Sequence, residues 1–183
     1  YELTGLLRGQ FGTDASMPEA WPVGTRVVLL DNALESLGGA AYFRGSVRHF
    51  RIGPAAQSIE GPSYVHKEHE FSANWQCPLS PVHLKSRRIS SGTEFTWVRR
   101  TRKGGDDWEA FEIPLGEERE QYLVQVMRSG VVVRETICES PRWVYPEADR
   151  LLDGPNCSIA VSQVSYSYGP GASAAILVPD LQD

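Results

Sequence analysis

Apolar and polar residues alternate over much of the second half of the chain, with the period of two that is typical of a half-buried β-strand. In residues 93–100, Phe95 and Trp97 are two positions apart and therefore share one face of a strand. Short stretches rich in glycine, serine and proline separate this segment from six similar ones. We predict strands at residues 82–88, 93–100, 120–128, 131–138, 142–145, 156–165 and 172–178.

The number and length of these segments predict an immunoglobulin-like β-sandwich for residues 78–183. A large aromatic residue on a strand with a polar reverse side fills the middle of such a sandwich. Ser129 and Gly130 fit the two-residue turn of a β-hairpin. The residues predicted to form the core are Phe95, Trp97, Tyr122, Val124, Val126, Ile159 and Val161.

Residues 1–77 have a β-rich pattern with longer loops. The apolar run at residues 25–31, TRVVLLD, predicts a strand that is buried on both faces. Prolines at 78 and 81 mark a domain boundary, because proline stiffens a linker and cannot continue a strand ladder. The chain starts with YELTGLLRGQ, without an apolar signal segment, so we expect residues 1–77 to complete a domain that begins upstream. Further strands are predicted at residues 1–8, 42–52 and 63–71, and one helical turn at 32–37.

The composition excludes several classes of function but does not identify one. The net charge of −5 argues against a nucleic-acid partner, since neutralising phosphates needs a basic face. The basic clusters at residues 85–88 and 99–103 are interpreted as solvated strand edges and turns. No apolar run approaches the roughly 18 residues of a membrane span. The widely spaced Cys77, Cys138 and Cys157 predict reduced thiols rather than disulfides or a zinc site.

Residues of types that bind metal ions or catalyse reactions occur in two polar segments. His66, Glu68, His69 and Glu70 are of types that bind metal ions, but on a strand His66 and His69 would point to opposite faces. A solvated polar segment is therefore favoured, and we predict no metal and no cofactor. The acidic run at residues 106–120 singles out no pair of carboxyls for glycoside hydrolysis, and no nucleophile motif is visible, so we predict no catalytic residue.

Aromatic residues near loops are the remaining candidates for a binding site. Such rings stack on sugars or anchor protein interfaces. Trp108 and Trp143 have an alternative role, which is to cover the ends of the sandwich. Tyr166 and Tyr168 lie beside the glycine-rich turn at 169–171 and are the preferred contact residues. The predicted binding residues are therefore Trp108, Trp143, Tyr166 and Tyr168.

The second half contains the stretch SPVHL, the strand with Trp97, the stretch YLVQV, and CSIAVSQVS followed by GPGASAAILV. Together they make residues 81–178 resemble a fibronectin type III domain. The chain departs from that family at Cys157, where a tyrosine is usual, and in the longer connection at residues 101–118. The resemblance implies a fibronectin-like sandwich at 78–183.

Longer stretches extend over nearly the whole chain. They are YELTGLLRGQFGTD, PVGTRVVLLD, RIGPA, PLSPVHLKSRR, FTWVRRTRKGGDDWEAFEIPLGEEREQY and VSQVSYSYGPG. With them the chain resembles the C-terminal region of the megatron, or baseplate hub, protein at the tail tip of gene transfer agents and related siphophages. The resemblance implies a structural, non-enzymatic virion protein at the distal end of the tail, made in the bacterial cytoplasm, and it implies that the β-rich residues 1–77 are a hub segment.

The same resemblance implies the partners. These are distal tail or hub proteins, fibre or spike proteins, further copies in a homotrimer formed through the hub, and a glycan of the host cell surface. Two alternatives stay open. One is a carbohydrate-binding module that recognises a bacterial surface glycan, and the other is a cell-wall hydrolase.

Overall fold

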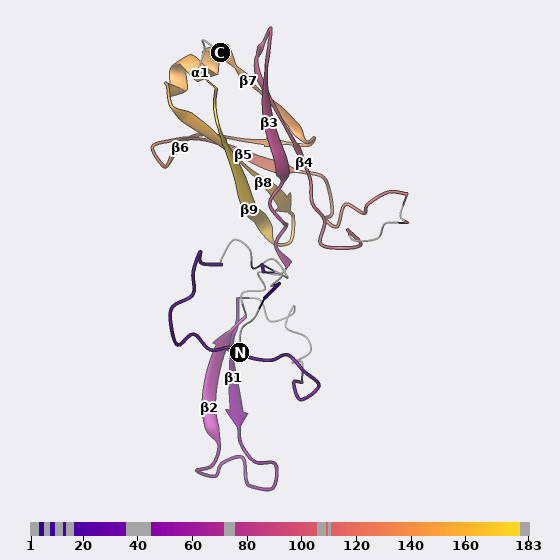
Figure 1. Cartoon of the computed structure of the whole chain (residues 1–183), viewed down its shortest axis with the longest axis vertical. Helices are drawn as coiled ribbons and strands as arrows, with labels where there is room; N and C mark the ends of the chain where they lie inside the picture. The colour runs from indigo at the N-terminus through magenta and orange to yellow at the C-terminus, as the bar shows by residue number, and fades with distance from the viewer. Residues whose placement is uncertain are drawn as a thin grey trace. The chain divides into compact units, whose positions relative to one another are not determined.

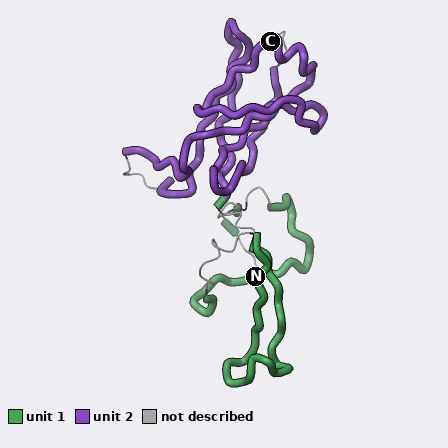
Figure 2. The backbone as a smooth tube through the Cα atoms, turned by 180° about the vertical axis from the view of Figure 1, so that it is seen from behind, with its two compact units in different colours: residues 1–76 green, residues 77–183 purple. Residues whose placement is uncertain are grey.

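The computed structural model describes residues 4–5, 8–9, 13, 17–35, 45–71, 76–105, 109 and 111–179. The chain divides into two compact units, Tyr1–Gln76 and Cys77–Asp183 (Figure 2). The division falls one residue before the boundary that the prolines indicate.

In the described residues of the first unit, one antiparallel pair of strands is present, β1 (Val47–Ile52) and β2 (Val65–Glu70). Both lie within segments that the sequence predicts as extended, although residues 42–44 are outside the described part. Every residue of the pair is exposed except Phe50, which is half-buried. Among the described residues, therefore, neither face of this hairpin is buried in a hydrophobic core.

The prediction of a buried strand at residues 25–31 is wrong. Residues 25–30 have no strand pairing, and Val27, Val28, Leu29 and Leu30 are between 66% and 82% exposed. A strand forms only where another strand takes up its backbone hydrogen bonds, and no described residue pairs with this run.

Residues 31–34 form a turn instead of the predicted helical start. The Asp31 carboxylate accepts the Ala33 N–H at 3.0 Å, and the Asp31 carbonyl accepts the Leu34 N–H at 3.1 Å. Residues 36 and 37 lie outside the described part, as does most of the strand predicted at residues 1–8.

The second unit consists of two antiparallel sheets (Figure 1). One has the strand order β3-β4-β7 and the other β6-β5-β8-β9. All seven predicted strands are present, with ends that differ by at most three residues. Their bounds are β3 Val82–Ile89, β4 Gly92–Val98, β5 Tyr122–Arg128, β6 Val131–Cys138, β7 Arg142–Pro146, β8 Cys157–Ser165 and β9 Gly169–Leu177.

The strand order identifies the type of sandwich. Consecutive strands β4 and β5 lie in different sheets, as do β6 and β7, and β7 and β8. Strand β6 extends the sheet of β5 and leaves β7 as an edge of the other sheet, which is the fibronectin type III arrangement of the immunoglobulin-like sandwich. The predicted hairpin is present between β5 and β6, where Ser129 and Gly130 have φ of 51° and 80°, as a type I′ turn requires. The second unit is thus a mostly-β, fibronectin-like sandwich, as the sequence predicts.

The core lies between the two sheets, which explains why buried and more exposed residues alternate along strands such as β4 and β5. Strand β4 contributes Phe95 and Trp97, and the Trp97 ring meets the ring of Tyr122 on β5 edge-on at a centroid distance of 5.2 Å. Burying a large apolar side chain stabilises a fold by about 1.5–3 kcal/mol. All seven residues that the sequence assigns to the core are buried there, joined by Tyr145 and Cys157.

A short helix, α1 (Glu147–Asp153), connects β7 to β8 and is absent from the sequence-based prediction. Seven residues span too few turns to display a helical period. Pro146 precedes the first helical residue, and Gly154, with φ of 87°, ends the helix. Within the described ranges, no helix has the length and apolar character needed to cross a membrane.

A buried carboxylate, Asp153, ties this corner to the sheets. It accepts hydrogen bonds from Arg134 Nε at 2.7 Å and from the Tyr145 hydroxyl at 2.8 Å, while its carbonyl accepts from Arg128 at 2.7 Å. The hydrogen bond from Arg134, helped by that from Tyr145, lowers the pKa of Asp153. Tyr145 of β7 therefore helps to fix this corner. The fibronectin type III family usually has a tyrosine at the position of Cys157, and here Cys157 packs in the core.

Candidate docking surface

The structure describes three of the four aromatic residues predicted to bind, and they do not share one loop. Tyr166 and Tyr168 lie in the turn between β8 and β9, where Tyr166 is 77% exposed and Tyr168 is half-buried. Trp143 lies in β7 instead, and its ring stacks on Tyr145 at 5.2 Å and packs against the core. That is the covering role left open for it by the sequence. Trp108 lies outside the described residues.

A single carboxylate, Glu118, holds the β8–β9 turn. Its Oε1 accepts the Ser167 hydroxyl at 2.5 Å, and its Oε2 accepts the Ser165 hydroxyl at 3.3 Å and the Tyr166 N–H at 3.2 Å. The Ser167 hydrogen bond, followed by those from backbone N–H groups and Ser165, lowers the pKa of Glu118 to about 2. The carboxylate is therefore ionised at neutral pH, and the turn is ordered around a fixed negative charge.

Two arginines of the long β4–β5 connection lie against the two tyrosines. The Arg119 guanidinium carbon is 5.6 Å from the centre of the Tyr166 ring, and that of Arg102 is 6.0 Å from the centre of the Tyr168 ring. Arg102 is itself fixed, because its Nε and Nη2 donate to the buried Glu117 carboxylate at 3.1 and 2.7 Å. We call the group Arg102, Glu118, Arg119, Tyr166 and Tyr168 the docking surface.

The connection beside this surface is held by arginine side chains rather than by regular structure. Arg99 donates to the carbonyls of Ile113 and Pro114 at 2.7 and 3.0 Å, and Arg100 donates to the Ser80 carbonyl at 2.7 Å. Between these segments lies a hollow of about 450 Å³. Its lining consists of Leu79, Arg99, Arg100, Thr101, Arg102, Gly104, Gly105 and Ile113.

The described carboxylates at this surface are engaged in hydrogen bonds and an ion pair. A glycosidase acid needs a raised pKa, whereas the pKa of Glu118 is lowered. Glu117 is paired with Arg102, and Glu120 accepts the Tyr122 hydroxyl at 2.7 Å. These carboxylates of the acidic run therefore serve to hold the connection and the neighbouring turn in place.

Sequence reasoning finds only part of this surface. It identifies Tyr166 and Tyr168 from their place beside a glycine-rich turn, but it misses Glu118, Arg102 and Arg119. The only local signal is the pair of serines that flank Tyr166, and their partner is 47 or more residues away in sequence.

Fold and surface together define a fibronectin type III-like module with an ordered loop end. No protein-family model matches the chain, and no curated protein matches it. Among solved structures, the chain is similar to the crystal structure of the rat CD45 extracellular region, domains d3–d4. The identity is 13%, the TM-score is 0.41, and the match covers 88% of this chain and 79% of that one. A likeness of this size carries no conclusion about function.

Proposed function

We propose that the chain is a structural component of a phage-like tail tip of the gene-transfer-agent type. In this role it belongs to the baseplate hub, a homotrimer at the distal end of the virion tail, and joins the end of the tail tube to peripheral fibre or receptor-binding proteins and the host surface. The motif resemblance over nearly the whole chain motivates this proposal. The observation that carries it is the docking surface, in which Glu118 orders a turn that bears the exposed Tyr166, and Arg119 lies against the Tyr166 ring.

The docking surface suits a protein partner. Tyrosine and arginine are the residues most enriched at the energetic centres of protein interfaces. Because Glu118 and Glu117 order the turn and Arg102 before any partner arrives, little conformational entropy is lost on binding. A non-enzymatic role is the simplest one for such a surface.

The alternative function is that of a carbohydrate-binding module, and the exposure of Tyr166 favours it. A ring that is 77% exposed can stack on a sugar. Arg119 lies over the Tyr166 ring, however, and Arg102 lies over the Tyr168 ring. Each arginine lies over one face of a tyrosine ring, so at most one face of each ring is left for a sugar. A protein partner is therefore preferred.

The test is to produce particles that carry the Tyr166→Ala/Arg119→Ala double variant and to image their tail tips by electron microscopy. We expect the tips to lose their peripheral appendages and the particles to lose adsorption to host cells. The matched control is Val131→Ala, because Val131 is 64% exposed at the opposite end of the four-stranded sheet. Control particles should keep both properties.

Two results would contradict the proposed role. Intact appendages together with normal adsorption would show that the surface attaches nothing. Intact appendages with lost adsorption, together with binding of the full chain to a bacterial glycan that Tyr166→Ala abolishes, would establish the carbohydrate-binding alternative instead.

A further inference from the structure

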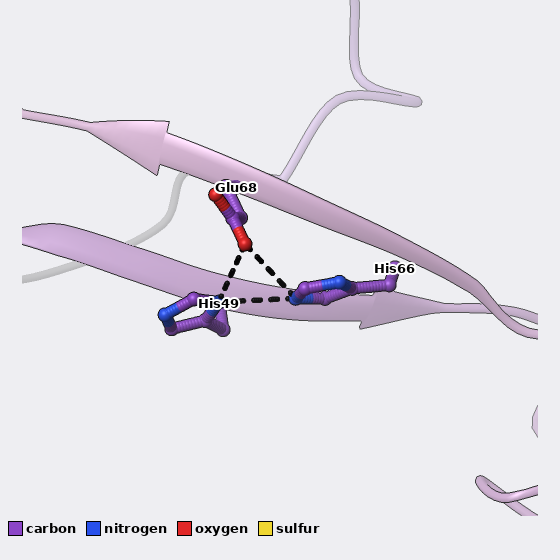
Figure 3. Close-up of side chains that lie close together, drawn as sticks. All are labelled: His49, His66 and Glu68. Carbon is purple, nitrogen blue, oxygen red and sulfur yellow. Dashed lines mark hydrogen bonds and ion pairs between the residues drawn. The ribbon is translucent and has the colours of Figure 1, made fainter.

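Three side chains of the β1–β2 pair converge on one point. They are His49, His66 and Glu68 (Figure 3). His49 lies directly opposite Glu68 in the strand register, and His66 precedes Glu68 by two positions on β2. Directly opposed residues share a face of a sheet, as do residues two apart on one strand. The three side chains therefore project from the same face, whereas His69 belongs to the other.

The distances between the three donor atoms fit a small metal ion. His49 Nδ1 is 3.0 Å from His66 Nε2 and 3.3 Å from Glu68 Oε1, and the last two atoms are 4.0 Å apart. A circle through three atoms at these separations has a radius of about 2.0 Å, within the range of about 2.0–2.2 Å for Zn–N and Zn–O bonds. An ion near the centre would be within bonding distance of all three donor atoms, and it would replace the hydrogen bond that now joins His49 Nδ1 and His66 Nε2.

The ligand types select the class of ion. Two imidazoles and one carboxylate suit Zn²⁺ and neighbouring transition metals, whereas Ca²⁺ and Mg²⁺ prefer sites made of oxygen alone. The side chains of His49, His66 and Glu68 are 62%, 50% and 58% exposed, so a fourth coordination position is open to water.

The charges on the same face are compatible with a bound cation. Arg51 is opposite His66 in the register, and its positive charge opposes a cation. Arg51 is exposed, so solvent and salt screen that repulsion. Glu70, two positions after Glu68 on β2, adds a negative charge to the same face.

Among the described residues, the hairpin buries little apolar surface of its own. A two-stranded hairpin without a core is marginally stable in water, and only Phe50 in this pair is even half-buried. A metal ion held by one residue of β1 and two of β2 would cross-link the strands and fix their register, because binding energy at such a site is also folding energy.

We propose that His49, His66 and Glu68 bind a Zn²⁺ ion that clips β1 to β2, with water as the fourth ligand. The sequence-based prediction assigned no metal, because it weighed His66 against His69 on the same strand. The actual partner is His49, which is 17 residues from His66 and is brought beside it by strand pairing. The site is independent of the function proposed for the docking surface.

The primary test is calorimetric titration of the metal-stripped full-length chain with Zn²⁺. We expect one ion per chain. His49→Gln, His66→Gln and Glu68→Gln should each weaken Zn²⁺ binding by at least about 10- to 100-fold. Losing a residue that only hydrogen-bonds to a metal ligand already weakens binding by that factor, and these residues are the ligands themselves. The matched control is His69→Gln, which changes the same strand on its other face and should bind as the unchanged protein does.

Nitrogen-15 NMR of the histidine rings gives a second readout. On addition of Zn²⁺, we expect the Nδ1 resonance of His49 and the Nε2 resonance of His66 to shift, and the β1–β2 amides to exchange more slowly with solvent. The proposal is overturned if the full chain does not bind Zn²⁺. It is equally overturned if binding survives unchanged in His49→Gln and His66→Gln, or if a variant of Cys77 or Cys138 abolishes it.

Discussion

The two units use similar residue types with opposite results. In Cys77–Asp183, the apolar faces of two sheets close on each other, and Phe95 and Ile159 are fully buried. In Tyr1–Gln76, none of the described apolar residues is fully buried, and Val28 and Leu30 are 66% and 82% exposed. One unit therefore has a core that holds its strands, while the described part of the other has a hairpin on which three side chains of one face converge.

The comparison teaches what a β pattern specifies. Alternation in β5 shows which side of the strand turns inward, and the opposing sheet then supplies the surface that covers it. The continuous apolar run at residues 25–31 has the stronger β character, yet no described strand pairs with it. A pattern thus gives the face that a strand would bury, and the fold must still supply a partner.

The largest expected effect comes from the core of the second unit. Phe95→Ala should lower the free energy of unfolding by about 3–5 kcal/mol, because it removes a fully buried ring and leaves a cavity between the sheets. Leu29→Ala, in the exposed run of the first unit, should change that free energy by less than about 0.5 kcal/mol. Urea denaturation followed by tryptophan fluorescence measures both. Similar losses for the two variants would mean that residues 25–30 are as well packed as the core.

A smaller effect, which depends on pH, is expected from the carboxylate at the α1 corner. Asp153→Asn weakens the hydrogen bonds from Arg134 and Tyr145 and should lower the free energy of unfolding at neutral pH by about 1–3 kcal/mol. The lowered pKa means that folded Asp153 binds a proton more weakly than unfolded Asp153 does. Its contribution is therefore complete above the ordinary pKa, near 3.8, and is lost as pH falls through the lowered folded value.

Denaturation curves at a series of pH values test this assignment. Between neutral pH and the acid range, the unchanged protein should lose more stability than Asp153→Asn does. The matched control is Glu139→Gln, which alters an exposed carboxylate of the same unit and should leave the pH dependence intact. An equal acid loss in the protein and in Asp153→Asn would assign the dependence to other carboxylates.

The strands of the sandwich could be predicted because each one is encoded by neighbouring residues in the sequence. The period of two in β4, β5 and β8 places Phe95, Val124 and Ile159 on inward faces, and turn residues such as Ser129 and Gly130 mark the strand ends. Helix α1 escaped prediction because it is short and is bounded by proline and glycine, which locally resemble a loop.

The polar clusters could not be predicted in the same way, because each joins residues that are far apart in sequence. Glu118 meets Ser167 across 49 positions, and His49 meets His66 across 17. Which acidic residue of a long run meets which serine depends on how the β4–β5 connection lies, and no periodic pattern encodes that. The same limit explains why the sequence analysis compared His66 with His69 on one strand and did not consider His49.

The smallest effect concerns the turn that Glu118 holds, where the well-packed unit should respond only locally. Glu118→Ala removes the acceptor of the Tyr166 N–H, so that amide should exchange with solvent severalfold faster. The denaturation midpoint should fall only slightly, because Glu118 is exposed and outside the core, where solvent screens its contacts. Hydrogen exchange followed by NMR measures the first quantity and urea denaturation the second. Glu112→Ala, an exposed carboxylate of the same connection, is the matched control and should alter neither.

Acidification should have the same local effect as this substitution, and it can be applied without a mutation. Because the pKa of Glu118 is about 2, its carboxylate keeps accepting from Ser167 and Tyr166 well below the pH at which ordinary glutamates take up a proton. Protection of the Tyr166 amide should therefore persist through the ordinary glutamate range near pH 4 and disappear only as pH falls through about 2. Loss of protection already near pH 4 would show that the turn is not held by this carboxylate, and the docking surface would then be no more preorganised than the exposed segments of the first unit.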